Sequence, residues 1–408
     1  MAEPAAILVA ARDEAGRIGE TVTTLRAAFP RADVVVADDG SRDATAREAA
    51  HAGARVLQLP PRGKGQALTL AERVAPPGAL LLADADLEGD LRPLVDGGDA
   101  DLAIAILAER VGGGFGVAKR VGRALVRRLS GYVGSEPLSG QRVLSPAARA
   151  ACFPLAAGFG VEVRMTIDAV RAGLVVTEVE LPLRHRSTGR DVAGFVHRGR
   201  QLLDALLACG PTAVNHRGLR LPLVGWALAA LGPWPVRAIG ALGLADDLWS
   251  GPARGFRGHL RVRRSTGTLK LVGIPSVALV ATRSLSKAAL VALAANVLNQ
   301  LDTRPGRALK AFLVAAAVLR RGPLRPLVGA VLIAPYDLRE MTMLGDAGSN
   351  ALGAVLGLGS VARLRGGRRW AAIAALAGLT VLGEVRSLGE LIERTPVLRE
   401  LDALGRQT

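Results

Sequence analysis

The sequence predicts an α/β domain with a Rossmann-like, mostly parallel sheet over residues 1–210, followed by an all-α membrane helical bundle over residues 211–408. In the first part, short apolar runs alternate with amphipathic stretches, which is typical of parallel strands joined by right-handed helical crossovers. In the second part, uncharged apolar runs are separated by arginine-rich connectors. A net charge of +16 together with a mean hydropathy of +0.29 suits a chain that lies on or in a membrane with anionic headgroups.

Composition excludes several classes of protein. Half of the 408 residues are apolar, so the chain can bury a full core and is not a disordered chain. Only two cysteines, Cys152 and Cys209, are present, which excludes a disulfide scaffold. The sequence has no zinc-finger spacing and no aromatic RNA-binding motif, so we expect no nucleic-acid partner despite the basic charge. Residues 1–14 do not read as a signal peptide, and we expect the first domain to stay in the cytoplasm.

Four apolar runs in the first part predict strands, and the stretches between them predict helices. Ligands of such sheets bind at the carboxyl ends of the strands, so the residues that follow each strand are the ones expected to carry chemistry. The strands are expected at 5–11, 33–38, 55–59 and 79–86, and the helices at 16–29, 43–53 and 64–74.

The second part contains apolar runs, none of which reaches the roughly 18–20 residues of a self-evident membrane span. Hydropathy alone therefore leaves two interpretations open, a buried helical domain or a polytopic bundle of short or broken spans. The arginine cluster between 254 and 270 would be a cytoplasmic loop by the positive-inside rule. The apolar runs lie at 221–236, 271–282, 288–301, 326–336, 347–362 and 370–383.

Acidic residues follow the second and fourth predicted strands. Asp38 and Asp39 begin a turn with Gly40, where carboxylates can accept hydrogen bonds from a base or a ribose. Asp84 and Asp86 are two residues apart at a strand end, so both can turn toward one divalent cation, Mg²⁺ or Mn²⁺, which would bridge a nucleotide diphosphate. The alternatives are a capping loop at the first position and a solvated acidic turn at the second.

Basic segments suggest contacts with phosphates and membranes. Lys64 stands between two glycines at the start of a predicted helix, where backbone N–H groups and the side chain can meet a phosphate. Residues 116–129 and 195–208 predict basic amphipathic helices, which either face a membrane or form solvated faces.

Four motifs of the first part occur in the order and spacing of family 2 glycosyltransferases with the GT-A fold: ILVAARDEAGRIGETV, VVVADDGSRDAT, PRGKGQA and LLADADL. Over about residues 5–190 the chain resembles the branch that makes polyprenyl-phosphate sugars such as dolichyl-phosphate mannose. The resemblance implies a metal-dependent enzyme with a nucleotide-sugar donor. Its donor site would include Ala11, Glu14, Asp39, Lys64 and Asp84, and the metal would be held by Asp84 and Asp86.

The resemblance also implies catalytic residues besides Asp86. Arg110 precedes a glycine-rich segment and Arg142 lies in a Ser-Gly-x-Arg turn, so both are candidates for binding the phosphates of donor or acceptor, with a surface arginine as the alternative for each. Glu162 lies in the stretch 158–190, which resembles the acceptor side of that family, and would point into the site.

Acidic residues at the ends of apolar helices indicate a second site, because charge at such positions is costly and therefore usually functional. The aspartates among them could assemble one Mg²⁺ site at the cytoplasmic face. The expected members of this site are Asp246, Asp247, Lys270, Asn296, Asp302 and Asp346.

Over about residues 215–360 these motifs resemble the polyprenyl-phosphate sugar-1-phosphate transferases. The chain departs from that family at Asn299, where the family carries an aspartate, and an amide cannot replace an anionic ligand. It also lacks the family's histidine-rich loop, because no histidine follows His259. Residues 394–406 predict an amphipathic terminal helix that lies on the membrane interface or on a partner.

We therefore expect a multi-pass protein of the cytoplasmic membrane that moves a sugar from a nucleotide-sugar donor to a lipid-phosphate acceptor of the polyprenyl-phosphate type, in cell-envelope glycan synthesis. One alternative is a bifunctional enzyme whose second part also transfers sugar-1-phosphate. Another is a second part that serves only as an anchor or scaffold. The sequence leaves homo-oligomerisation open.

Overall fold

The computed structural model divides the chain into two compact units, Met1–Pro222 and Leu223–Thr408. The division falls after the boundary expected at residue 210, because a hairpin of β8 (Thr212–Val214) and β9 (Arg220–Pro222) belongs to the first unit. Arg73 donates to the carbonyl oxygens of Arg217 and Gly218 in the loop of this hairpin. The structure describes residues 3–87, 89–96, 99–109, 117–184, 202–249, 266–319 and 324–406.

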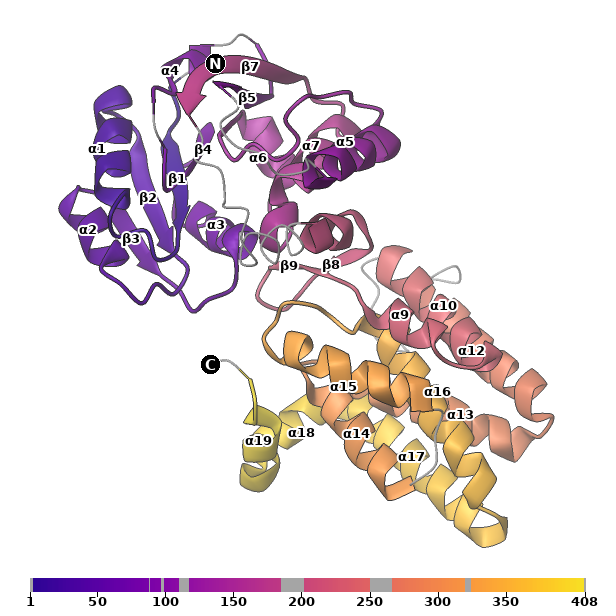
Figure 1. The fold of residues 1–408 in the computed structure, drawn as a ribbon. Coiled ribbons are helices and arrows are strands. Elements are labelled where there is room, and N and C mark those ends of the chain that lie inside the picture. The colour runs from indigo at the N-terminus through magenta and orange to yellow at the C-terminus, as the bar shows by residue number, and fades with distance from the viewer. Residues whose placement is uncertain are drawn as a thin grey trace. The chain divides into compact units, whose positions relative to one another are not determined.

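The first unit is built on a seven-stranded, mostly parallel sheet with the order β3-β2-β1-β4-β6-β5-β7 (Figure 1). Only β6 runs antiparallel to its two neighbours, β4 and β5. This arrangement confirms the expected mostly parallel sheet, with the four predicted strands forming one half of it. The strands are β1 (Ala6–Ala11), β2 (Asp33–Asp38), β3 (Arg55–Gln58), β4 (Leu80–Asp84), β5 (Leu102–Glu109), β6 (Arg142–Leu144) and β7 (Val176–Arg184).

Helices cover both faces of this sheet. Alternate residues of β1 point to opposite faces, so that Ile7 and Val9 join one core and Leu8 joins the other. Helices α1 (Ile18–Ala28) and α4 (Arg92–Asp96) complete the first core, and α3 (Lys64–Glu72), α6 (Pro146–Cys152) and α7 (Val161–Arg171) complete the second. The remaining elements are α2 (Thr45–His51), α5 (Val117–Ser130) and the 3₁₀ turn η1 (Gly158–Gly160).

The second unit is all-helical in the part of the chain that the structure describes, as expected. Its core lies around α16, and glycines of this helix allow close approach of its neighbours: a Cβ at Gly357 would lie 2.6 Å from the Cα of Val291 in α13. The helices are α9 (Gly225–Ala230), α10 (Trp234–Trp249), α12 (Thr266–Thr282), α13 (Leu285–Leu301), α14 (Arg307–Leu319), α15 (Leu324–Leu338), α16 (Gly345–Arg363), α17 (Gly366–Val385), α18 (Leu388–Arg394) and α19 (Pro396–Ala403).

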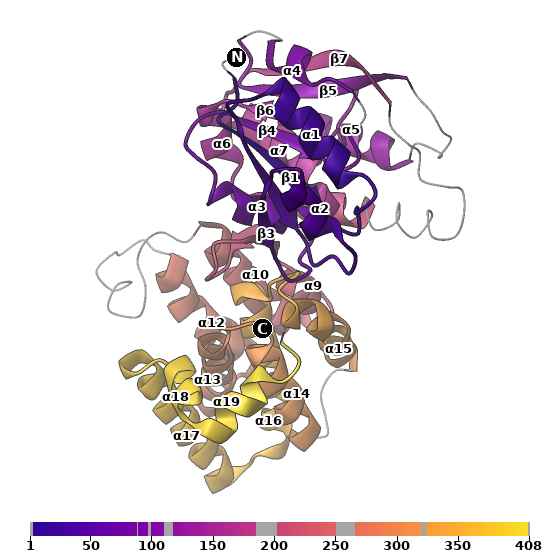
Figure 2. The ribbon, with the colours of Figure 1, turned by 90° about the vertical axis from the view of Figure 1, so that its left-hand side faces the viewer.

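Within the described ranges, no single helix is both long and apolar enough to cross a bilayer. The pair Gly366–Val385 and Leu388–Arg394 satisfies length and composition only when taken together, and the pair is bent by 87°. Figure 2 shows this bend between α17 and α18, with α19 following beside α18.

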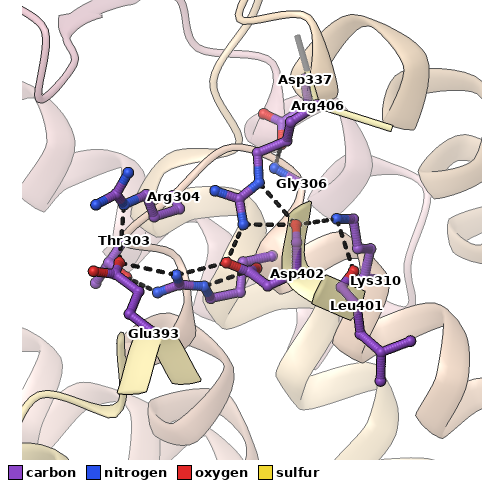
Figure 3. Close-up of polar contacts among 10 residues, drawn as sticks. Thr303, Arg304, Gly306, Lys310, Asp337, Glu393, Leu401, Asp402 and Arg406 are labelled. Carbon is purple, nitrogen blue, oxygen red and sulfur yellow. Dashed lines mark hydrogen bonds and ion pairs between the residues drawn. The ribbon is translucent and has the colours of Figure 1, made fainter. Parts of the chain in front are cut away.

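The C-terminal helices are fastened to the bundle by buried charges (Figure 3). Arg307, at the start of α14, makes a bidentate pair of hydrogen bonds with the carboxylate of Asp402 in α19, with Nε–Oδ1 at 3.0 Å and Nη2–Oδ2 at 2.7 Å. Arg406 pairs with the same carboxylate, and Glu393 of α18 lies 3.4 Å from Arg307. The helix expected at residues 394–406 therefore packs on the chain's own bundle.

Candidate functional site

Three parallel strands of the first unit end at the same edge of the sheet. In their register Ala11 of β1 lies opposite Asp38 of β2, and Ala10 lies opposite Asp84 of β4. The segments that follow these strands therefore meet above the carboxyl ends of the sheet, where ligands of such sheets bind. Ala11 itself is buried there.

Asp39 closes the turn after β2. Its carboxylate accepts hydrogen bonds from the backbone N–H groups of Arg62 at 2.6 Å and Gly63 at 2.9 Å, and Arg12 lies 4.0 Å away. Burial raises the pKa of Asp39, although the two backbone donors oppose this shift. Asp39 thus ties the end of β2 to the start of α3. Its expected contact with a nucleoside stays a prediction.

Glu14 lies in the loop after β1. Its backbone N–H donates to the hydroxyl of Thr45 at 2.8 Å, and its carboxylate pairs with Arg17 at 3.1 Å. Burial raises the pKa of Glu14, Arg17 lowers it, and the negative charge of Asp86 raises it further. Glu14 and Asp86, expected as a donor ligand and a metal ligand, thus act on each other electrostatically.

Lys64 joins two of the expected site residues directly. Its ammonium lies 2.7 Å from Oδ1 of Asp84 and 2.8 Å from Oε1 of Glu162, which stands in the first turn of α7. Gln141 donates from Nε2 to the other oxygen of Asp84 at 3.0 Å. Burial alone would lower the pKa of Lys64, but the carboxylates of Asp84 and Glu162 outweigh it and raise that pKa above the ordinary lysine value. Lys64 is therefore firmly cationic.

Two glycines make room for this arrangement. A Cβ at Gly65 would overlap the carbonyl oxygen of Ala156, so only glycine lets the start of α3 approach this segment. A Cβ at Gly140 would overlap the carboxylate of Asp84. Because β6 runs antiparallel to β4 with Arg142 opposite Leu82, the residues just before β6 reach the end of β4.

The carboxylates at the end of β4 fit a divalent cation that is shared with a diphosphate. Asp86 is partly exposed and makes no hydrogen bond or ion pair with any other residue that the structure describes. The described ranges contain no group of three or more His, Cys, Asp or Glu side chains that could hold a metal ion. Mg²⁺ is commonly held by one or two carboxylates, with waters and substrate phosphates completing its shell. Asp84 and Asp86 are two such carboxylates, and their expected role as metal ligands stays a prediction.

Arg142 does not have the role expected for it. The side chain is fully buried, and it donates to the carbonyl oxygens of Ser139 and Pro137 and to the hydroxyl of Thr166, at 2.8, 3.2 and 2.9 Å. Burial also lowers the pKa of Arg142. Because its donors face the protein interior, Arg142 supports the turn before β6 and does not reach a substrate phosphate.

Arg110, the other arginine expected in the site, lies outside the residues that the structure describes.

The structure adds Gln141 to the site. This residue was not expected there, although it is next to Arg142, which was. Its position between a Ser-Gly turn and a short strand was the available signal, and the antiparallel register of β6 that brings it to Asp84 is not visible in the sequence.

The second unit brings most of its expected site residues together. Lys270 of α12 lies 2.6 Å from Oδ2 of Asp246 and also pairs with Asp346. Asp247 accepts hydrogen bonds from the backbone N–H groups of Asp346 at 2.9 Å and Ala347 at 3.0 Å, at the N-terminal end of α16. Carboxylates are favoured at such an end by the exposed N–H groups and the helix dipole.

The other expected members of this second site behave differently. Asp302 follows α13, and its pKa is raised first by burial and then by the charges of Asp337, Asp346 and Asp247, so it lies within their field. Asn296 is not part of the cluster, because its amide donates to Thr380 of α17 at 3.2 Å. Asn299, one turn later, is the residue that faces α16, where it accepts a hydrogen bond from Ser349 at 2.8 Å.

Residues 6–116, all within the first unit, match the family model described as glycosyl transferase family 2. A curated relative, glycosyltransferase AglJ of Haloferax volcanii, is 29% identical over 198 residues, which are 45% of this chain and 64% of the relative. The chain thus spans less than two thirds of that relative's length.

Solved structures similar to the chain include glucosyl-3-phosphoglycerate synthase from Mycobacterium tuberculosis in two complexes. The complex with Mn²⁺, uridine diphosphate and phosphoglyceric acid is 26% identical, with a TM-score of 0.42 over 51% of this chain and 79% of that one. The complex with Mg²⁺ and uridine diphosphate is 24% identical, with a TM-score of 0.41 over the same shares of the two chains.

Proposed function

We propose, from the family 2 domain at residues 6–116, that the protein is a glycosyltransferase that takes a sugar from a nucleotide-sugar donor. The observation that carries this proposal is the cluster at the end of β4. There the half-buried Lys64, the carboxylate of Asp86 and the carboxylate of Asp84, which is held by Lys64 and Gln141, lie at the ligand-binding edge of a parallel sheet.

In this proposal the donor lies across the ends of β1, β2 and β4. Ala11, Glu14 and Asp39 line the nucleoside side, and Asp84 and Asp86 hold Mg²⁺ or Mn²⁺. When bound, such a cation neutralises charge on the leaving diphosphate. Lys64 supplies a second positive charge on the diphosphate side, and Glu162 keeps its ammonium in place at 2.8 Å.

We infer that the acceptor is a lipid-linked phosphate of the polyprenyl-phosphate type, reached at a membrane surface with the first unit on the cytoplasmic side. Helix α5 carries five cationic residues and no acidic residue, and Arg127 and Arg128 are exposed and make no ion pair with the other described residues. A neighbouring helix, residues 202–209, exposes Leu203 and Leu206. Basic and apolar side chains on adjacent helices suit anionic lipid headgroups.

These helices are adjacent because they share one small core. Val126 of α5, Val163 of α7 and Ala205 are buried in the same apolar cluster. The guanidinium of Arg164 also donates to the carbonyl oxygen of Ala208 at 3.0 Å. The side chains that remain outside this core are the ones available to a lipid surface.

The second unit supports two readings of its own role. A bifunctional enzyme, which also transfers sugar-1-phosphate to a lipid phosphate, is favoured by the three carboxylates gathered around Lys270. An anchor or scaffold without turnover is favoured by Asn299, because its amide oxygen is engaged by Ser349 and carries no charge for a cation.

The test is incubation of the membrane-reconstituted full chain with several labelled nucleotide sugars and polyprenyl phosphate, identifying the lipid product and the released nucleotide. Release of a nucleoside diphosphate supports the proposal, and Asp86→Ala is expected to lower turnover about 100-fold or more. Asp90→Ala is the matched control, because Asp90 pairs with Arg92 at the surface. Full activity of Asp86→Ala contradicts the assignment.

The same assay separates the two readings of the second unit. Release of a nucleoside monophosphate that stops in Asp346→Ala supports a second transferase. If Asp346→Ala changes neither the released nucleotide nor the lipid product, the second unit acts without turnover of its own.

A further inference from the structure

The Lys64 ammonium stands where a cation would have to approach Asp84. It lies 2.7 Å from Oδ1 of Asp84, while Gln141 holds Oδ2 at 3.0 Å. The side chains of Lys64 and Asp84 are 21% and 28% exposed, and that of Glu162 is 6% exposed. One positive charge is thus shared by two carboxylates at the bottom of the site, and one oxygen of the expected metal ligand is already engaged by a cation.

We propose that Lys64 is an internal counter-ion, which blocks Asp84 until the diphosphate of the donor arrives and then moves its charge onto that diphosphate. The proposal rests on the proposed function, because it needs a donor with a diphosphate and a divalent cation. It adds that metal binding and donor binding are coupled through one side chain of the chain itself.

The coupling follows from charge. A divalent cation at Asp84 and an ammonium at the same oxygen repel each other, and this repulsion is strong in a site that is largely screened from water. A diphosphate brings negative charge that accepts the ammonium and lets the divalent cation take its place. Without nucleotide, the metal must displace Lys64 with nothing to compensate the lysine.

Glu162 lets this exchange occur without losing the lysine. Its carboxylate stands in the first turn of α7, on a different element from Asp84, and keeps its own contact with the ammonium at 2.8 Å. The ammonium can therefore leave Asp84 while it stays paired with Glu162. Glu162 is in this scheme a positioning residue that acts through Lys64.

The test measures Mn²⁺ binding to the full chain, by calorimetry or by the spin resonance of free Mn²⁺, first without nucleotide and then with uridine or guanosine diphosphate. Couplings between two ligands are typically about 5- to 150-fold. In the wild type we expect weak Mn²⁺ binding alone. In Lys64→Met we expect Mn²⁺ binding without nucleotide to become about tenfold tighter, and diphosphate binding without metal to become weaker.

A second variant guards against misfolding. Lys64→Met leaves Glu162 buried without its cation, whereas Lys64→Met/Glu162→Gln removes both charges of that pair, which is better tolerated in a protein interior. The double variant is expected to show the same gain in Mn²⁺ affinity. Lys119→Met is the matched control, because it breaks a lysine–glutamate pair with Glu136 elsewhere in the first unit and should leave Mn²⁺ binding unchanged.

The outcomes separate this proposal from the proposed function. If the wild type binds Mn²⁺ with a nucleoside diphosphate but both lysine variants bind Mn²⁺ alone no more tightly than the wild type, the counter-ion role is wrong and the donor site stands. If the wild type binds no nucleoside diphosphate with Mn²⁺ at all, the donor site is wrong and the counter-ion role falls with it.

Discussion

Replacing Asp402 by asparagine is expected to destabilise the second unit strongly. The carboxylate of Asp402 accepts two hydrogen bonds from the guanidinium of Arg307. The side chain of Asp402 is 8% exposed and that of Arg307 is 4% exposed. Asparagine keeps the shape of the aspartate but removes its charge, and its amide group turns a donor toward the donors of the arginine. The substitution therefore leaves a buried guanidinium without its main partner.

The size of the effect follows from burial. Removing one partner of a buried ion pair typically costs about 3–5 kcal/mol, because an uncompensated charge remains inside. Glu393 lies 3.4 Å from Arg307 and can compensate in part, but its side chain is 42% exposed and its contact is screened by water. We therefore expect the free energy of unfolding of the second unit to fall by about 3 kcal/mol.

Tryptophan fluorescence during urea unfolding reports on the second unit, because all four tryptophans lie there: Trp226, Trp234, Trp249 and Trp370. Glu400→Gln, an exposed change on the same helix, is the control and should stay within about 0.5 kcal/mol of the wild type. Arg307→Met/Asp402→Leu, which removes both charges, should lose less than about 1 kcal/mol. A loss below about 1 kcal/mol in Asp402→Asn itself would refute the reasoning.

Three further predictions concern the donor site, the pH dependence of stability and the membrane surface. Gly140→Ala should weaken binding of Mn²⁺ with a nucleoside diphosphate about tenfold or more by calorimetry, because the new methyl group overlaps the carboxylate behind it; unchanged affinity contradicts this. Burial would raise the pKa of Asp402, but its two arginine partners lower it, so its contribution to stability is full above pH ~4 and is lost as pH falls through the lower folded-state value. The free energy of unfolding of the wild type, measured with urea, should fall with this pH change, and that of Asp402→Asn should not. The same pH dependence in both proteins would argue against this reasoning. Arg127→Glu with Arg128→Glu should weaken binding to vesicles of anionic lipid at low salt, with Arg47→Glu as the exposed control, and equal binding of all three proteins counts against this surface.

The strand ends of the first unit could be predicted because each was marked locally. An apolar run, then a carboxylate, then a glycine or a helix start is a pattern that the chain repeats, and parallel topology puts the carboxyl ends of such strands at one edge. Asp39 and Asp84 were found in this way. The pattern could not show which side chains contact these carboxylates. The lysine that pairs with Asp84 lies 20 residues away in the sequence, on another element.

Arg142 illustrates where sequence reasoning fails for a charged residue. A motif match favoured an arginine that meets phosphates, and a surface position was the only alternative weighed. The structure has neither, because three protein oxygens satisfy the guanidinium inside the fold. Whether an arginine is buried depends on the short antiparallel strand β6 and on α7, and neither contact is encoded in the residues next to it.

Asn296 and Asn299 show the same limit on a helix. Both lie on the last turns of α13, three positions apart in the sequence, so helical spacing places them nearly on one face. The structure divides them: Asn296 faces α17, and Asn299 faces α16 and the charged cluster. Which of the two asparagines faces which neighbour depends on how α13 packs against α16 and α17, and helical periodicity alone does not define this.

The C-terminal helices bear on the charged cluster of the second unit through the loop after α13. Asp302 begins that loop, and Arg307 ends it at the start of α14. Asp402 holds Arg307, Glu393 lies 3.1 Å from Arg304, and Asp337 accepts from the N–H group of Gly306 at 2.7 Å (Figure 3). The loop is thus fixed at three successive points, two of them supplied by helices about one hundred residues later in the chain. Asp302 therefore begins a segment that is held by contacts from α15, α18 and α19, and the terminal helix that the sequence assigns to a membrane or a partner supplies one of these contacts.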